Sequence, residues 1–317
     1  MPVVLTGFTL VLGFLLQPAG PVQSVAVTFD DLPVTSVLPL SRTERDSLTA
    51  RLLGAIRRHH VPAIGFVNEN KLVDSTGRLD PAQVALLQRW LERGLELGNH
   101  TWSHPDLHRV TLADFEAEIL KGERVTRQLL AERGKVPRYF RHPFLHTGRS
   151  VAVRDSLKEF LDSLGYRVAP VTIDNSDYIF AAAYDRALGA QDRPSADRIR
   201  TTYLDYMDSV TAFYQGQAVA IVGRELPQIL LLHANRLNAD AFDGVARMFE
   251  RRGYGFIPLD QALEDPAYRS PDSYTGAGGI TWLHRWAITA GVSRDVFKGE
   301  PEVPEWVAIQ ARPAGTN

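Results

Sequence analysis

The chain has 317 residues, of which 44% are hydrophobic and 23% are charged, with 35 basic and 37 acidic side chains and no cysteine. This composition and length are those of an ordinary globular protein with one large α/β domain. The absence of a basic excess argues against a nucleic-acid-binding protein. Without cysteine, any transition-metal site must be built from His, Asp or Glu.

The N-terminus carries an uncharged, largely apolar segment. Residues 1–29 contain no charged side chain, and the apolar run over 3–16 has the length of a signal-peptide core rather than of a membrane span. No Lys or Arg precedes the run, which departs from the usual signal peptide, and a buried N-terminal strand or helix is the alternative. We expect residues 1–23 to be a signal peptide or N-terminal anchor. The protein is then exported to a periplasmic, extracellular or cell-envelope location, and contacts a membrane only through an uncleaved N-terminus.

Short apolar runs alternate with longer amphipathic stretches along the rest of the chain. We predict strands at 25–29, 63–67, 95–98, 138–141, 167–173, 228–232 and 255–258. The helical spacing of apolar positions predicts helices at 42–59, 80–93, 111–132, 150–164, 194–214 and 239–252. This β-then-α alternation favours a parallel sheet, either an open doubly wound one or a closed barrel.

Two segments fall outside this alternation. Residues 175–192 form an insertion after the fifth predicted strand, and residues 266–317 form a tail that contains three tryptophans. We therefore expect one barrel domain over 24–265 and a C-terminal extension over 266–317 that packs on it.

Five polar motifs each follow a predicted strand. They are TFDD at 28–31, HTWSH at 100–104, FRHPF at 140–144, DNSDY at 174–178 and LLLH at 230–233. In a parallel barrel the carboxyl ends of the strands meet at one face, and active sites lie there. The five motifs are therefore predicted to converge on one site.

Each motif alone has an ordinary interpretation as well as a chemical one. Of two adjacent carboxylates, one could bind a metal and the other act as a base, but Asp-Asp pairs are also common in turns. Two histidines four residues apart could reach one ion from one face of a helical turn, or be a surface pair; Thr101 stands where a metalloprotease helix needs Glu. Arg141 could hold a carboxylate bidentately or lie on the surface. His233 closes an apolar strand, as a core residue or an active-site group.

The order of these motifs resembles that of the polysaccharide deacetylase family, also called the NodB-homology or carbohydrate esterase family 4 group, over residues 25–263. The resemblance implies an irregular (β/α) barrel of about seven strands. It implies a metal-dependent hydrolase that removes N-acetyl or O-acetyl groups from a carbohydrate. The substrate partner is then an acetylated glycan or amino sugar.

The resemblance also implies a role for each motif residue. Asp31, His100 and His104 would bind one divalent metal ion. Zinc is the expected ion, and the same ligand types also accept cobalt, nickel or iron(II). Asp30 would be the general base and Arg141 would hold it.

The other implied roles fall in the later motifs. His233 would be the general acid, oriented by Asp177, with Asp174 as the competing choice. Leu231 and Tyr178 would line the pocket for the acyl methyl group, and the backbone near Phe144 would donate a hydrogen bond to the oxyanion.

This sequence departs from the family pattern in places. Tyr178 stands where the family usually has Trp, and His142 and His146 flank the third motif as extra ligands or substrate contacts. Two alternatives stay open: a non-catalytic carbohydrate-binding protein of the same fold, and a related hydrolase of a small non-sugar amide or a sugar ester.

Overall fold

The sheet of this α/β protein is entirely parallel and curls around a buried first strand. The computed structural model describes residues 23–313, so the predicted signal peptide or anchor lies, apart from Gln23, outside the described residues. The strands are β1 (Gln23–Leu32), β2 (Ile64–Val67), β3 (Glu96–Asn99), β4 (Tyr139–Phe140), β5 (Arg167–Val168), β6 (Gln228–His233) and β7 (Tyr254–Phe256). Their order is β5-β4-β3-β2-β1-β6, and β7 pairs with the start of β1. A parallel bridge between Ile173 and Leu230 joins the chain after β5 to β6. The irregular (β/α) barrel predicted from the sequence is confirmed.

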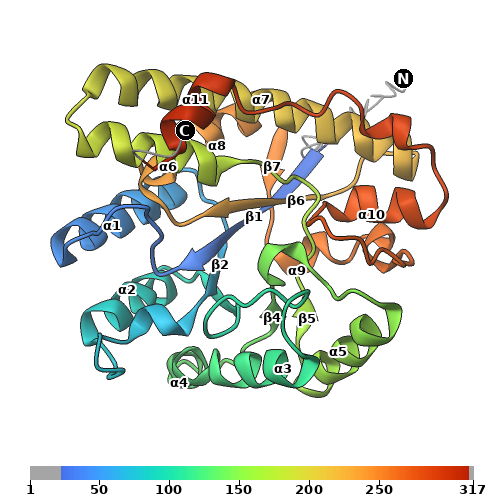
Figure 1. Cartoon of the computed structure of the whole chain (residues 1–317), viewed down its shortest axis with the longest axis horizontal. Helices are drawn as coiled ribbons and strands as arrows, with labels where there is room; N and C mark the ends of the chain where they lie inside the picture. The colour runs from blue at the N-terminus through green and yellow to red at the C-terminus, as the bar shows by residue number, and fades with distance from the viewer. Residues whose placement is uncertain (1–22, 314–317) are drawn as a thin grey trace, which may run out of the picture.

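Helices surround this sheet (Figure 1). They are α1 (Arg42–Arg58), α2 (Pro81–Glu92), α3 (Leu112–Lys121), α4 (Arg124–Ala131), α5 (Val151–Ser163), α6 (Asp177–Gly189), α7 (Arg193–Val222), α8 (Arg236–Arg251) and the short α9 (Leu259–Ala262). Local sequence sets their starts: Ser41 and Glu44 form a capping box on α1, and Asp80 caps α2 ahead of Pro81.

The core is built on β1, which is buried because apolar residues occupy both of its faces. The Phe29 ring meets Trp90 of α2 and Phe242 of α8 edge-on, at centroid distances of 5.7 and 5.4 Å. These contacts fix the end of β1 between helices from opposite parts of the chain.

The single helix predicted over 111–132 is wrong, because the chain breaks into α3 and α4 at Gly122. The main-chain oxygens of Glu118 and Ile119 accept hydrogen bonds from the Trp102 N–H and from Asn99 Nδ2, at 3.0 and 2.9 Å. A Cβ on Gly122 would overlap the Thr101 main chain. The helix ends here because the loop after β3 packs against its last turn.

The insertion predicted over 175–192 forms helix α6, which is largely buried. Helix α7 runs eight residues beyond its predicted end at 214, through Gly216 to Val222. Helix α8 begins three residues before the predicted 239, because Asn235 caps it through the Asn238 N–H. Strands β4 and β5 keep only two residues each of the predicted 138–141 and 167–173.

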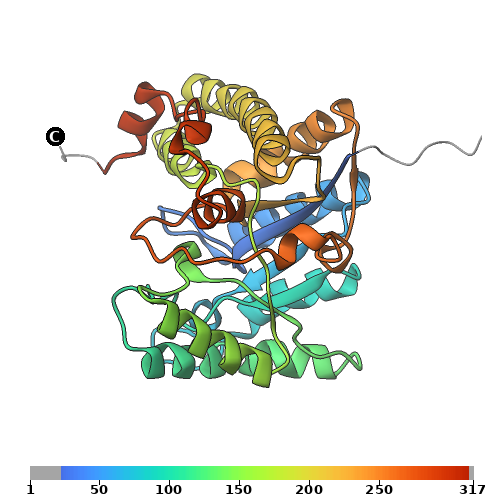
Figure 2. The ribbon, with the colours of Figure 1, turned by 90° about the vertical axis from the view of Figure 1, so that its right-hand side faces the viewer.

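The C-terminal extension contains η3 (Pro266–Arg269), α10 (Trp282–Thr289), η4 (Arg294–Phe297) and α11 (Glu305–Ala311). Helix α10 contacts α7 and α11 contacts α6 (Figure 2). Arg285 of α10 is buried and paired with Asp272 at 2.7 Å, and it donates to Thr147 Oγ1 at 2.5 Å. The extension is thereby attached to the loop after β4.

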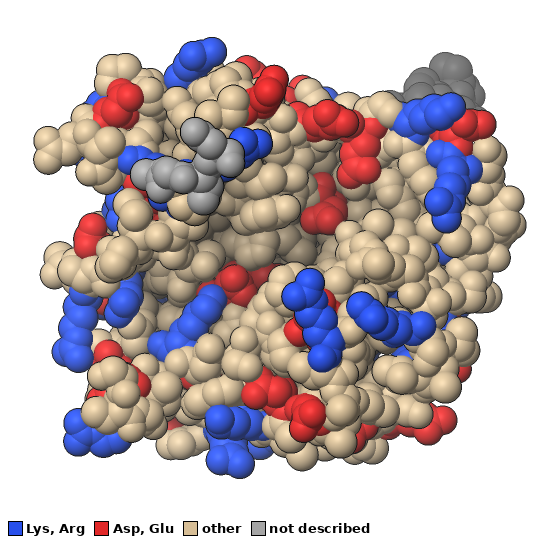
Figure 3. Space-filling model, viewed as in Figure 1, with Lys and Arg blue, Asp and Glu red and all other residues tan. Residues whose placement is uncertain are grey.

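Acidic and basic side chains alternate over the surface seen in Figure 3, and acidic side chains lie inside a hollow near its centre. Among residues 23–313, no helix has the length and apolarity needed to span a bilayer.

Candidate active site

The carboxyl ends of the strands bring the predicted site residues to one cavity of about 520 Å³. The parallel register pairs Asp30 of β1 with His233 of β6. Eight of the predicted residues line the cavity: Asp30, Asp31, His100, His104, Phe144, Tyr178, Leu231 and His233. Arg141 and Asp177 are fully buried behind it. The predicted convergence of the motifs therefore holds in the structure.

Asp31, His100 and His104 offer three ligand atoms that all lie within 4.8 Å of one another. His100 Nε2 and His104 Nε2 lie 3.8 and 3.9 Å from Asp31 Oδ1, and this buried oxygen has no hydrogen-bond partner. Two imidazoles and one carboxylate are an open donor set for a catalytic transition metal. The orphaned oxygen and the donor set fit the divalent ion that the resemblance implies.

The sequence interpretation placed His100 and His104 on one helical turn, but in the structure they lie in a loop. They meet through a tight loop in which Thr101 and His104 adopt positive φ, at 68° and 60°, and Asp31 does the same at 68°. Backbone strain of this kind often clusters at functional sites.

His100 is oriented by a hydrogen bond from its Nδ1 to the Arg141 main-chain oxygen at 2.8 Å. Because a carbonyl only accepts, Nδ1 carries the proton and Nε2 presents its lone pair toward Asp31 and His104. Burial lowers the pKa of His100, and the neighbouring His104 lowers it further. The pKa of His104 is also lowered by burial, despite the charge of Asp31.

Asp30 is buried and carries no hydrogen bond at Oδ1. Burial raises its pKa to about 6, and the charges of Arg141 and His233 offset only part of this effect. The adjacent Asp31 behaves differently. Burial would raise its pKa, but Lys71, His233 and the two ligand histidines outweigh burial and hold it well below its usual range. Neighbouring carboxylates in one cavity thus differ in basicity.

Arg141 does not form the bidentate hydrogen bonds with Asp30 that the sequence suggested. Its Nε lies 3.8 Å from Asp30 Oδ1, while its Nη2 donates to Thr28 Oγ1 at 2.7 Å. The guanidinium also lies over the Phe66 ring, 4.9 Å from the centroid. It therefore acts on Asp30 as a buried charge at ion-pair distance.

The hydrogen-bond partner of His233 is Asp177 and not Asp174. Asp177 Oδ1 lies 2.7 Å from His233 Nδ1, and Asp177 Oδ2 accepts from the His233 main-chain N–H at 2.8 Å. Burial would lower the pKa of His233, but the charge and hydrogen bond of Asp177 raise it to about 10. Asp174 is half-buried at the cavity wall, and burial raises its pKa to about 7.

The cavity wall includes both exposed and buried apolar side chains. Phe144, in a left-handed conformation with φ of 55°, places its ring edge-on to His104 with centroids 4.5 Å apart. Tyr178 lies beside His233, and Leu231 is buried below them. The Leu145 N–H is already donated to the His142 oxygen, so it is not free to serve as an oxyanion donor.

Sequence reasoning missed several residues around the site, among them Lys71, Asn68 and Gly279. Lys71, in η1 (Glu69–Leu72) after β2, lies 3.5 Å from Asp31 Oδ2 and donates to the Asp31 main-chain oxygen at 2.9 Å. Asn68 donates to the His100 oxygen at 2.6 Å. Both follow a predicted strand, so the strand-end rule that found the motifs could have found them too. Gly279 of the extension also lines the cavity, and no local signal marked it.

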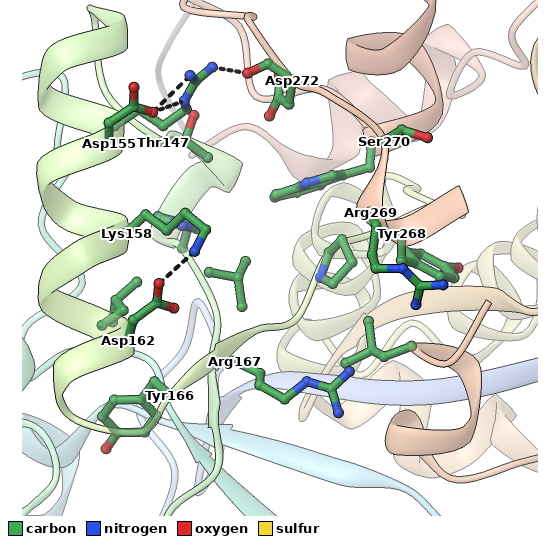
Figure 4. A pocket seen from close by; sticks show the side chains of 17 residues that line it. Thr147, Asp155, Lys158, Asp162, Tyr166, Arg167, Tyr268, Arg269, Ser270 and Asp272 are labelled. Atoms are coloured by element: carbon green, nitrogen blue, oxygen red, sulfur yellow. Dashed lines mark hydrogen bonds and ion pairs between the residues drawn. The ribbon is translucent and has the colours of Figure 1, made fainter. Parts of the chain in front are cut away.

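A second cavity of about 510 Å³ lies between α5 and the C-terminal extension. Lys158, paired with Asp162, and Arg167 and Arg269 line it, as Figure 4 shows. His142 borders both cavities and is buried between them, where burial lowers its pKa to about 3. The metal-ligand groups found among residues 23–313 lie outside this second cavity.

Fold and site together define a parallel α/β barrel with a His/Asp metal-ligand group beside a carboxylate–histidine pair. Residues 18–169 match the polysaccharide deacetylase family model. The resemblance seen in the motifs is thereby confirmed over this segment, which is similar to the polysaccharide deacetylase family.

Relatives of known name support the same assignment. The chain is 29% identical over 154 residues to a chitin deacetylase of Colletotrichum lindemuthianum, covering 49% of this chain and 52% of that protein. It is 26% identical over 161 residues to the peptidoglycan-N-acetylglucosamine deacetylase PgdA of Listeria monocytogenes, covering 51% of this chain and 28% of that protein. The chain thus spans about half of one relative and under a third of the other. The polysaccharide deacetylase Bc1974 from Bacillus cereus shares the fold, with a TM-score of 0.50 and 16% identity over 81% of this chain and all of that one.

Proposed function

We propose that this protein is a metal-dependent hydrolase that removes N-acetyl, or O-acetyl, groups from a carbohydrate. The observation that carries the proposal is the placement of Asp30 and His233 as register partners beside the ligand group of Asp31, His100 and His104. Deacetylation needs an activated water, a stabilised oxyanion and a proton for the leaving group. This cavity offers a candidate for each requirement.

A divalent ion held by these three ligands would act as a Lewis acid toward the acyl carbonyl and the attacking water. Asp30 is the base that takes the proton from that water. With its pKa raised to about 6, Asp30 is ionised at neutral pH and more basic than an ordinary carboxylate. The buried charge of Arg141 favours this ionised form.

His233 gives its proton to the departing nitrogen. Its pKa, raised to about 10 by Asp177, keeps the ring protonated at neutral pH. The two bonds from Asp177 also fix the ring position. Base and acid thus occupy neighbouring strands with opposite protonation states, as acid–base catalysis requires.

The substrate proposed is an acetylated glycan or amino sugar, by analogy with the chitin and peptidoglycan deacetylases it resembles. Tyr178, Leu231 and Phe144 supply apolar surface for the acyl methyl and the sugar ring. Zinc is the proposed ion. Export through residues 1–23 would bring the protein to cell-envelope substrates.

Acetate release tests the proposal. The purified protein is offered chitooligosaccharide, peptidoglycan and acetylated xylan, with added zinc and with chelator. Asp30→Asn is compared with Asp205→Asn, which changes an exposed carboxylate on α7. We expect release that requires zinc and Asp30 but not Asp205. Zinc binding without release from any substrate would favour the sugar-binding or small-amide alternatives, and absence of zinc binding would refute the mechanism.

A further inference from the structure

A second group of metal-ligand side chains lies beside the candidate active site. Asp106, His108 and His146 each offer one ligand atom, and these atoms all lie within 4.8 Å of one another. Asp106 and His108 belong to the loop after β3, just beyond His104. His146 follows η2 (Pro143–Leu145) in the loop after β4 and also lines the active-site cavity. The group therefore joins two site loops that are far apart in sequence.

The three side chains lie in direct contact with one another. Asp106 Oδ1 lies 2.7 Å from His146 Nδ1 and accepts the His108 main-chain N–H at 2.8 Å. The rings of His108 and His146 are stacked, with centroids 4.0 Å apart and planes 4° from parallel. The neighbouring cation, Arg109, lies 3.4 Å from Asp106 Oδ2 but is largely exposed. The ligand atoms are thus held close without a buried cation among them.

His108 provides an independent indication of a ligand. Its side chain is only 8% exposed, yet neither ring nitrogen makes a hydrogen bond of ordinary geometry. Buried polar groups in native proteins nearly always have a partner. The Gly148 main chain interacts with the His108 ring, but at least one ring nitrogen has no partner in the protein.

We propose that Asp106, His108 and His146 bind a second divalent transition-metal ion. Two imidazoles and one carboxylate favour ions of the zinc, cobalt and nickel class over magnesium or calcium. Asp106 and His146 are partly exposed, which leaves a route for the ion and room for water to complete its coordination.

The proposed ion positions the cavity wall and takes no part in the reaction. The His104 and Phe144 rings are in contact, and Phe144 lies 5.9 Å from the His146 ring. Joining the two loops through an ion would hold Phe144 against His104. This proposal concerns a site separate from the metal ligands of the proposed function.

Metal counting on the purified protein tests the second site. The wild type and three variants are saturated with zinc, freed of excess by gel filtration, and analysed by mass spectrometry for zinc per chain. The variants are His108→Gln/His146→Gln, Asp31→Asn/His104→Gln, and the control His60→Asn on an exposed histidine. We expect two ions in the wild type and the control, and one in each double variant.

Each other result decides the question. Zinc content unchanged by His108→Gln/His146→Gln overturns the second site, and so does a single ion that only Asp31→Asn/His104→Gln removes. A single ion removed only by His108→Gln/His146→Gln supports the second site and counts against the proposed function.

If His108→Gln/His146→Gln fails to fold, a second measurement tests the site. Histidine ring ¹⁵N signals are recorded while zinc is added to Asp31→Asn/His104→Gln. Shifts at His108 and His146 support the site, and unchanged signals overturn it.

Discussion

Asp30 and His233 are register partners on the neighbouring parallel strands β1 and β6. The Ala234 N–H also donates to the Asp30 main-chain oxygen at 3.2 Å, so the backbone keeps the two residues level at the strand ends. Burial raises the pKa of the carboxyl to about 6, and Asp177 raises the pKa of the imidazole to about 10. A base and an acid therefore face one cavity in the protonation states that their proposed roles require.

The first prediction concerns the alkaline limb of activity. His233 is useful as an acid only while protonated, so kcat should fall as pH rises through about 10. Asp177→Asn removes the charge that raises this pKa, and we expect the limb to move toward the ordinary histidine value of about 6.5. The measurement is a pH profile of kcat. Asp174→Asn serves as the control, because Asp174 makes no bond to His233 and its variant should keep the limb near its original place. An unmoved limb in Asp177→Asn would exclude this acid role.

The second prediction concerns Gly279. An added Cβ would overlap the Phe144 main-chain oxygen, so Gly279→Ala should push the loop after β4 into the cavity. We expect kcat/KM to fall by roughly tenfold or more, since misplacements of about 1 Å can cost about 10²-fold. Gly278→Ala is a matched control, because its Cβ would meet nothing nearer than 3.6 Å. Equal kcat/KM in the two variants on an acetylated oligosaccharide would show that this contact does not shape the site.

The third prediction concerns Gly122, where α3 ends against the loop that carries both histidine ligands. Gly122→Ala would overlap the Thr101 main chain and displace His100 and His104. Zinc affinity measured by titration calorimetry should fall and the melting temperature should drop. Gly216→Ala, on an open face of α7, should instead stabilise by about 0.5–1 kcal/mol. Unchanged zinc affinity in Gly122→Ala would mean that the loop is held by other contacts.

The fourth prediction concerns metal and thermal stability. An ion that binds only the folded chain stabilises it by about 2.7 kcal/mol at 100 times its dissociation constant. A protein of this size should then melt about 4 °C higher with zinc than with chelator. Asp31→Asn should lose the larger part of this shift in melting temperature, because Asp31 Oδ1 lies 3.8 and 3.9 Å from the Nε2 atoms of the two histidines and is a proposed ligand atom. The exposed-site variant Asp205→Asn should keep the whole shift, and its loss there would point to nonspecific binding.

Much of the fold follows from sequence pattern alone. Apolar runs located the strands, and polar motifs placed directly after them located the cavity, because parallel strands bring their carboxyl ends to one face. The residues that pattern could identify were those with unusual side chains at strand ends, such as Asp30 and His233.

The rest depends on tertiary contacts that no local pattern encodes. Helical periodicity continues across Gly122, and the break comes from a loop that packs there from elsewhere. Lys71 follows a predicted strand, but its pairing with Asp31 joins residues 40 positions apart in the sequence. The choice between Asp174 and Asp177 needed the hydrogen bonds of His233.

The segment that matches the family model ends before part of the candidate active site. Residues 18–169 contain Asp30, Asp31, both histidine ligands and Arg141, while Asp177, His233 and Gly279 lie beyond its end. The family model thus covers the proposed metal ligands and base and ends before the proposed acid, its partner Asp177 and the wall residue Gly279. Residues from both segments therefore shape the proposed substrate cavity, because Phe144 lies within 18–169 while Tyr178, Leu231 and Gly279 lie beyond it.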